Sequence, residues 1–232
     1  MQRKIFLVLT AGGHGTRMGG AIPKQFLSIG GKAVLHLTME RFIDACPGIT
    51  IVTVLPKEHF QWWKQYCETH NFHYPQTLVA GGITRFHSVK NALSRIPDGA
   101  LVAVHDGVRP FISKELIQKM FQKMEEVRAL IPVLPQTDTL KVLDKDRETG
   151  VLSTTDESLD RSRVFGAQTP QIFYSEDLKE AYSEPFDPLF TDDASVAQRH
   201  KIPLSYIEGE RLNIKITTPE DLAIGESILK LS

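Results

Sequence analysis

A glycine-rich loop near the amino terminus contains the residue types of a phosphate-binding site. The stretch LTAGGHGTRMGGAIPKQF spans residues 9–26 and follows a short apolar run. Backbone N–H groups of such a loop can surround an anion, and Arg17 and Lys24 supply positive charge. The loop is neither a Walker A motif nor a dinucleotide fingerprint, because no Gly-Lys-Ser/Thr follows and Met18 stands where the third glycine is needed. The alternative interpretation is a strand-to-helix turn with solvated charges.

A second segment, VHDGVRPF at 104–111, places a carboxylate directly after a buried apolar run. Open α/β sheets bind ligands at the carboxyl ends of their strands. Asp106 would be a natural Mg²⁺ ligand there, because hard cations take carboxylate oxygens and share phosphate oxygens. Arg109 follows three residues later and could reach a second phosphate. The alternative for Asp106 is a residue that caps backbone N–H groups at the start of a loop.

Two further segments could complete a nucleotide site. In GGITRFHSVKNAL (81–93), Gly82 permits close approach of the backbone to a ligand, and Ser88 lies one turn into a predicted helix, where it could contact a base. In NIKITTPEDL (213–222), Lys215 belongs to a predicted strand. The alternatives are an ordinary exposed helix serine and a solvated edge lysine. Lys215 becomes a site candidate only if its strand returns to the glycine loop.

No acid–base pair or thiol site accompanies these segments. The histidines have no metal-ligand spacing, and His14, inside the loop, has no acid–base partner nearby in the sequence. Cys46 and Cys67 lack metal spacing and are expected to be small core residues. A Gly-x-Ser-x-Gly motif is absent from the sequence. We therefore assign no catalytic histidine, and the chemistry must rest on charge and positioning.

Along the chain, short apolar runs alternate with amphipathic segments. Continuous apolar strands between helices predict an α/β fold with a mostly parallel sheet buried on both faces. Ser113 suits a helix N-cap, and Pro219 suits the first turn of the last helix. The predicted strands are 5–10, 49–55, 76–80, 101–106, 129–134, 202–209 and 213–217, and the predicted helices are 33–45, 57–70, 84–96, 113–127, 177–182, 191–200 and one from 219.

The pattern changes after residue 136. The segment TDTLKVLDKDRETGVLSTTDESLDR contains little core-forming material, and DRETG is typical of a tight turn between extended pieces at 139–143 and 150–155. We interpret the chain as a single domain, 1–232, with a protruding hairpin arm at about 137–160. Because the arm has too few apolar residues to pack on its own domain, we expect it to dock on a second subunit.

Composition excludes several classes of partner. The chain has 232 residues, 41% of them hydrophobic, and a net charge of -1. This is enough for one sizeable core, and it gives no overall basic signal for binding nucleic acid or a membrane surface. The amino-terminal apolar run is too short for a signal peptide or a spanning helix. We expect a soluble, cytoplasmic protein with neither a nucleic-acid nor a membrane partner.

Seven motifs in register resemble the 2-C-methyl-D-erythritol 4-phosphate cytidylyltransferases of the non-mevalonate isoprenoid pathway. They cover essentially the whole chain, the arm included, and the resemblance implies a Rossmann-like nucleotidyltransferase fold with helices on both faces of the sheet. Gly12 and Gly107 stand where that family usually has alanine. The motifs are TAGGHGTRMG…PKQF, GGITRFHSV, VHDGVRPF, TDTLK, LDRSRVFGAQTPQIF, TDDAS and NIKITTPEDL.

The resemblance also implies the substrates and the residues that bind them. CTP with Mg²⁺ would be the donor, a sugar-alcohol phosphate the acceptor, and the enzyme a homodimer joined through the arm. Carried over by motif, the catalytic residues around the triphosphate and the α-phosphorus are Arg17, Lys24 and Lys215, and the metal ligand is Asp106. The residues that frame the cytidine are Ala11, Gly12, Gly13, Gly82 and Ser88. The acceptor contacts are Asp106, Arg109, Thr139, Arg161, Thr169 and Thr191.

This chemistry explains the absence of a catalytic histidine. An acceptor phosphate oxygen attacks the α-phosphorus in line and pyrophosphate leaves, which needs positioning and charge neutralisation rather than a strong base. D-Ribitol-5-phosphate cytidylyltransferases share the CTP half, but DTLK and LDRS are similar to the methylerythritol phosphate enzymes. Two other classes are a non-catalytic nucleotide-binding module and a dehydrogenase, the latter disfavoured by the failed dinucleotide fingerprint.

Overall fold

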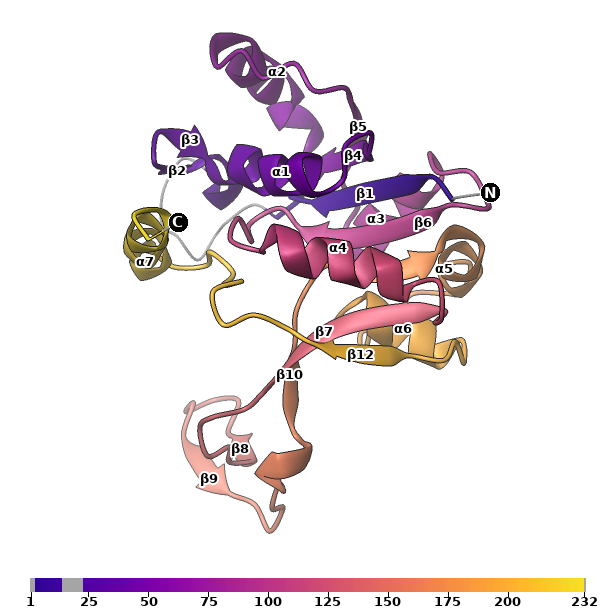
Figure 1. Ribbon diagram of the computed structural model, residues 1–232. Coiled ribbons are helices and arrows are strands. Elements are labelled where there is room, and N and C mark those ends of the chain that lie inside the picture. The colour runs from indigo at the N-terminus through magenta and orange to yellow at the C-terminus, as the bar shows by residue number, and fades with distance from the viewer. Residues whose placement is uncertain (1–2, 14–22, 232) are drawn as a thin grey trace.

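The computed structural model describes residues 3–13 and 23–231, and these form one large sheet flanked by helices (Figure 1). Five predicted strands are confirmed almost to the residue. They are β1 (Ile5–Thr10), β4 (Thr50–Leu55), β5 (Gln76–Ala80), β6 (Leu101–Asp106) and β7 (Ala129–Pro135). The strand order is β10-β7-β11-β6-β1-β4-β5, and β12 (Ser205–Glu208) also pairs with β7.

The sheet is mixed because a late antiparallel strand is inserted into it. β1 pairs in parallel with both β4 and β6, so their carboxyl ends meet at one edge. β11 (Gln171–Tyr174) runs antiparallel between β6 and β7, and β10 (Phe165–Ala167) continues along the same side of β7. No sequence pattern predicts β10 or β11, because each is short and a polar Gln-Thr-Pro stretch separates them.

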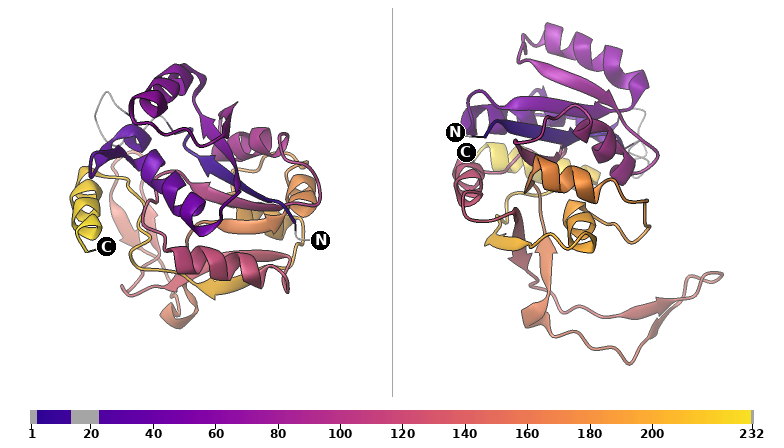
Figure 2. Two further views of the ribbon diagram at one scale, coloured as in Figure 1. Left: turned by 45° about the horizontal axis from the view of Figure 1, so that its top comes forward. Right: turned by 90° about the vertical axis from the view of Figure 1, so that its right-hand side faces the viewer.

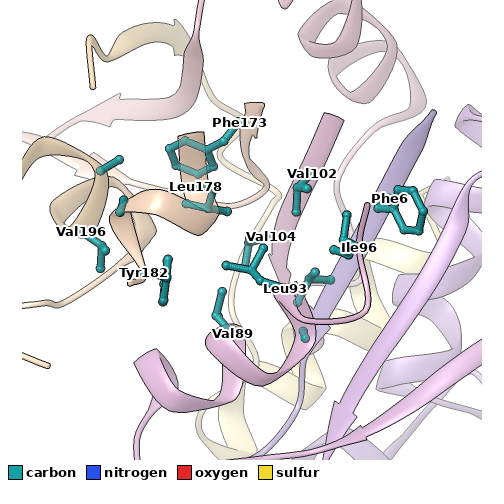
Figure 3. Close-up of a cluster of buried hydrophobic side chains, with 14 of the residues drawn as sticks. Phe6, Val89, Leu93, Ile96, Val102, Val104, Phe173, Leu178, Tyr182 and Val196 are labelled. Atoms are coloured by element: carbon teal, nitrogen blue, oxygen red, sulfur yellow. The ribbon is translucent and has the colours of Figure 1, made fainter. Parts of the chain in front are cut away.

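Both faces of the sheet are buried, as the continuous apolar strands predict. Along β1, Phe6 and Val8 enter one hydrophobic cluster, while Leu7 and Leu9 enter the other. The helices α3 (Arg85–Leu93), α5 (Ser175–Ala181) and α6 (Asp193–Arg199) cover the first face, where their side chains meet Val102, Val104 and Phe173 (Figure 3). The helices α1 (Val34–Ala45) and α4 (Lys114–Lys123) cover the second. Among the described residues, no helix is long and apolar enough to cross a bilayer.

The helix ends follow the predicted caps, although several helices are shorter than expected. Ser113 caps α4 by accepting the N–H of Leu116 at 3.0 Å, and Pro219 opens α7 (Pro219–Leu229). The segment predicted as one helix at 57–70 begins as a 3-10 turn, η3 (Lys57–His59), and continues as α2 (Phe60–Thr69). Another 3-10 turn, η2 (Lys24–Phe26), precedes a small hairpin of β2 (Ser28–Ile29) and β3 (Lys32–Ala33).

The prediction of a strand at 213–217 is wrong. This segment lies in an extended loop, where the N–H of Ile216 donates to the carbonyl of Val108 at 2.9 Å. It does not run along a neighbouring strand, because it crosses the turn after β6 on its way to α7. Ile216 is nevertheless fully buried, in a third cluster with Val34 and Ile228. The alternating pattern therefore reflects one buried residue beside an exposed lysine.

The predicted hairpin arm projects from the sheet (Figure 2, right). Its strands β8 (Leu143–Lys145) and β9 (Leu152–Thr154) are shorter than expected, and every residue in them is exposed. The DRETG turn is confirmed, since Asp146 accepts the N–H groups of Glu148 and Thr149, and Gly150 has a φ of 72°. After the turn, the chain returns through the 3-10 turn η4 (Arg161–Arg163) to β10.

Candidate active site

A cavity of about 400 Å³ lies where β1, β5 and β6 end. Its walls bring together segments that are far apart in the sequence: the backbone after β1, the turn η2, the loop into α3 and the loop before α7. Lys215 lines the same cavity as Ala11, Gly12 and Gly13, so it meets the condition under which it becomes a site candidate. The lining includes eight of the predicted site residues, namely Ala11, Gly12, Gly13, Lys24, Gly82, Ser88, Asp106 and Lys215. Arg17 and His14 lie outside the described residues.

Asp106 is the electrostatic centre of this cavity. Its Oδ2 atom lies 2.9 Å from Lys215 Nζ and 3.3 Å from Arg109 Nε, and its Oδ1 atom lies 3.9 Å from Arg85 Nε. Burial alone would raise the pKa of this carboxyl, but the three cations outweigh burial and hold it well below its usual range. Asp106 is therefore ionised and stabilised by three neighbouring cations, which the alternative of a simple backbone cap does not explain.

A buried histidine and threonine fix the backbone beneath Asp106. The N–H of Asp106 donates to Thr169 Oγ1 at 3.1 Å. His105 Nε2 lies 3.1 Å from the carbonyl oxygen of Arg109, so it donates, and burial lowers the pKa of His105 to about 4. The remaining nitrogen of the neutral ring, Nδ1, accepts from the Thr169 hydroxyl at 3.0 Å. Thr169 is thus buried behind the cavity with its hydroxyl hydrogen already used.

The same hydrogen-bond network positions Lys215 beside Asp106. Asn213 is fully buried, and its side-chain amide donates to the carbonyl of Thr169 at 2.9 Å. Arg109 Nη1 in turn donates to the carbonyl of Asn213 at 2.7 Å. These two bonds tie the 213–217 loop to the turn after β6, which is why Lys215 reaches Asp106 without belonging to a strand.

Lys24 is positioned by its neighbours in η2. Gln25 is 1% exposed, and its amide donates to the carbonyl of Ala11 at 2.9 Å, which joins the turn to the glycine loop. Phe26 packs against Trp62 of α2 with ring centroids 4.1 Å apart. The aromatic residues of α2 therefore support the turn that carries Lys24.

Ser88 is buried and shapes the loop at Gly82, so the interpretation as an ordinary exposed serine is wrong. Its hydroxyl accepts the N–H of Gly82 at 3.0 Å and donates to the carbonyl of Thr84 at 3.0 Å. A Cβ on Gly82 would collide with the Cβ of His87 and lie 2.9 Å from its carbonyl carbon. The close turn into α3 therefore requires glycine at position 82.

The remaining predicted acceptor residues lie in two other places. Thr191 is exposed at a second hollow of about 730 Å³, between α6 and the base of the arm. Thr139 and Arg161 are exposed in the arm, where Arg161 Nη1 donates to the carbonyl of Thr137 at 3.1 Å. None of these three residues lines the cavity around Asp106.

Sequence reasoning missed Gln25, His105 and Arg85. Gln25 and His105 stand directly beside predicted site residues, but only their burial and hydrogen bonds indicate a role. Arg85 lies within the GGITRFHSV segment and lines the cavity beside Asp106. Its partner Asp193 is distant in the sequence, so the motif alone does not reveal the ion pair.

Residues 5–231 match the family model described as 2-C-methyl-D-erythritol 4-phosphate cytidylyltransferase (IspD). The chain belongs to this family. It is therefore a cytidylyltransferase with the Rossmann-like nucleotidyltransferase fold, and the predicted family and fold class are confirmed.

Curated relatives and solved structures agree with this membership. The 2-C-methyl-D-erythritol 4-phosphate cytidylyltransferase of Bacteroides thetaiotaomicron is 46% identical, over 96% of this chain and 98% of its own length. That of Porphyromonas gingivalis strain W83 is 44% identical, over 99% of both chains. The crystal structure of 4-diphosphocytidyl-2C-methyl-D-erythritol synthase from Anaerococcus prevotii superposes with a TM-score of 0.78 at 28% identity, covering 98% of this chain and 99% of that one.

Proposed function

We propose that this cytidylyltransferase transfers CMP from CTP to 2-C-methyl-D-erythritol 4-phosphate, giving 4-diphosphocytidyl-2-C-methyl-D-erythritol and pyrophosphate. The observation that carries the proposal is the convergence of the glycine-loop backbone, Lys24, Lys215 and Asp106 on one cavity at the carboxyl edge of the sheet. We also propose a cytoplasmic location, as the sequence predicts.

The residues of the cavity have distinct roles in this proposal. Backbone N–H groups of Gly12 and Gly13 and the Gly82–Ser88 turn frame the nucleotide. Lys24 and Lys215 neutralise charge that develops on the α-phosphoryl oxygens and on the leaving pyrophosphate. Arg17 would contribute to the same task from the glycine loop. The acceptor phosphate is ionised near neutral pH, so the site holds and orients a nucleophile that needs no strong base.

Asp106 is the residue that would hold Mg²⁺. Lys215 and Arg109 contact its Oδ2 atom, while Oδ1 lies 3.5 Å from Thr10 Oγ1 and 3.9 Å from Arg85 Nε. A carboxylate oxygen beside a hydroxyl suits a hard cation that takes its other ligands from phosphates and water. Within 3–13 and 23–231, no three His, Cys, Asp or Glu side chains gather as a metal cage. When bound, Mg²⁺ would neutralise triphosphate charge.

The arm would complete the acceptor site of a second copy of this chain. Its exposed apolar side chains have no core of their own: Val151 is 62% exposed, Leu152 61% and Leu159 47%. Burying them on a partner is favourable at about 25 cal/mol per Å² of apolar surface. Such docking would bring Thr139 and Arg161 of one subunit to the Arg109, Thr169 and Thr191 region of the other. Arg161 could then bind the acceptor phosphate through two parallel hydrogen bonds.

Pyrophosphate release tests the proposal directly. The enzyme is assayed with CTP and Mg²⁺, and with either 2-C-methyl-D-erythritol 4-phosphate or D-ribitol 5-phosphate as acceptor. We expect release with both CTP and the methylerythritol phosphate, and a higher kcat/KM for this acceptor than for the ribitol phosphate. The reverse preference would replace the acceptor but keep the cytidylyl transfer. CTP binding without release with either acceptor would contradict catalysis.

A further inference from the structure

Arg85 forms a bidentate ion pair with Asp193, which joins the start of α3 to the start of α6. It is the first residue of α3, directly after the N-cap Thr84. Its Nη1 atom donates to Asp193 Oδ1 at 2.9 Å, and its Nη2 atom donates to Asp193 Oδ2 at 2.6 Å. A parallel pair of hydrogen bonds fixes both the distance and the orientation of the two groups. The pair therefore sets how the start of α3 lies against its partner element.

The partner element, α6, belongs to the acceptor side of the site. Asp193 is the first residue of α6, is 0% exposed, and also accepts the hydroxyl of Tyr182 at 2.6 Å. Thr191, a proposed acceptor contact, lies two residues before it. A carboxylate this deeply buried is strongly unfavourable unless it is paired with a cation. The pair with Arg85 therefore favours the position in which α6 begins next to α3.

The third contact of Arg85 is with the centre of the site. Its Nε atom lies 3.9 Å from Asp106 Oδ1, whereas Lys215 contacts the other carboxylate oxygen, Oδ2. Arg85 also lines the nucleotide cavity, together with Gly82 and Ser88. One guanidinium thus contacts the carboxylate, borders the nucleotide cavity and holds the helix beside the acceptor residues.

We propose that Arg85 is a positioning residue that keeps the acceptor side of the site, through Asp193 and α6, aligned with the nucleotide cavity. This inference rests on the proposed function, since it uses Thr191 as an acceptor contact. Arg85 acts through Asp193 and Asp106, and its loss should affect acceptor use more than CTP binding. A purely structural ion pair would instead change the stability of the fold and leave the kinetics of the folded enzyme unchanged.

The test replaces the charged pair by a neutral one. The double variant Arg85→Gln/Asp193→Asn conserves net charge, leaves an acceptor for Tyr182, and avoids the unpaired buried charge that either single change would create. The matched control is Arg128→Gln/Asp177→Asn, because Arg128 and Asp177 form another bidentate pair, on the surface and outside the cavity. Thermal unfolding of each variant measures the structural contribution separately.

We expect the Arg85/Asp193 variant to raise the acceptor KM at least tenfold and to lower kcat, while the calorimetric Kd for CTP without acceptor stays within about threefold. The control should keep wild-type kinetics. Arg85→Lys retains the positive charge but cannot form the two parallel hydrogen bonds to Asp193. The acceptor KM of this variant should therefore also stay above the wild-type value. Wild-type kinetics in the double variant, or in Arg85→Lys, would overturn the inference. Inactivity of the wild-type enzyme with CTP and methylerythritol phosphate would instead contradict the proposed function.

Discussion

At the scale of single residues, the site is built from cations that surround one buried anion. Asp106 holds Lys215 and Arg109 in place by direct ion pairs, and Lys24 faces the same cavity. Preorganised charges of this kind cost no rearrangement at the moment of reaction, which is why they stabilise a transition state more than a ground state. Lys24 and Lys215 should therefore affect turnover more than nucleotide binding.

Replacing Lys24 or Lys215 by methionine tests this. We expect each change to lower kcat about 10²–10³-fold, with a smaller rise in the KM for CTP. The reason is that a positive group aligned with the negative charge of the transition state is lost. Lys64→Met, an exposed residue of α2, is the matched control and should behave as wild type. A kcat within a few-fold of wild type for Lys24→Met would remove Lys24 from the catalytic set.

Glu176 gives a pH-dependent prediction about stability. Burial opposes its ionisation, but its own backbone N–H, Arg3, Gly99 and Ser175 outweigh burial and lower the pKa of Glu176 to about 2. Since this pKa lies below the ordinary value of 4.5, ionised Glu176 stabilises the fold above about pH 4.5, and this stabilisation is lost as the pH falls toward 2.

Urea unfolding of wild type and Glu176→Gln at several pH values measures this effect. The difference in the free energy of unfolding between the two proteins should be largest near neutral pH and should shrink between about pH 4.5 and 2. A difference that does not change with pH would show that the carboxylate charge contributes nothing. Because Glu176 lies at the amino terminus of α5, away from the cavity, activity at neutral pH should be unchanged.

At the scale of elements, the loop between β5 and α3 is set by one glycine and one serine. The hydrogen bond from Gly82 to Ser88 Oγ closes the turn, and the backbone of His87 leaves no room for a side chain at position 82. The loop geometry therefore depends on the first turn of α3.

Gly82→Ala should push the loop away from α3 and break the bond to Ser88. We expect the KM for CTP to rise about tenfold, comparable with the loss of one hydrogen bond, while kcat at saturating CTP changes less. Ser88→Ala removes the same hydrogen bond without the steric conflict and should raise the KM in the same direction. An unchanged KM for CTP in both variants would exclude this loop from nucleotide binding.

At the scale of the whole molecule, the arm is a long extension whose strands bury none of their residues within the chain. An isolated two-stranded hairpin is at best marginally stable in water, which supports the proposed docking of the arm on a second subunit. A crossed arrangement would place Arg161 of one subunit at the acceptor site of the other. The two subunits would then depend on each other for catalysis.

Mixed dimers distinguish the arrangements. One subunit carries Arg161→Met and the other Lys24→Met, and differently tagged chains allow the mixed dimer to be purified. If the arms cross, one site contains both changes and the other contains neither, so activity should return to about half of wild type. If each arm serves its own subunit, both sites are damaged and activity stays low. Purification of each variant alone provides the baseline.

Those parts of the fold that depend on local pattern can be predicted from the amino-acid sequence. Five parallel strands follow from continuous apolar runs, the N-cap Ser113 and the helix start at Pro219 follow from helix-end chemistry, and the DRETG turn follows from its residues. Motif order was enough for the family, because seven short segments in register are far more specific than any one of them.

Which distant residues contact one another depends on how the elements pack. Lys215 reaches Asp106 from a loop that pattern alone had predicted to be a strand, because buried Asn213 ties that loop to Thr169. The pairing of Arg85 with Asp193 spans 108 residues, and the insertion of β11 between β6 and β7 likewise depends on contacts between distant segments. Hydrophobic periodicity reports which face of an element is buried, but not which distant side chain shares that burial. The partners of a buried charge are fixed when the elements pack.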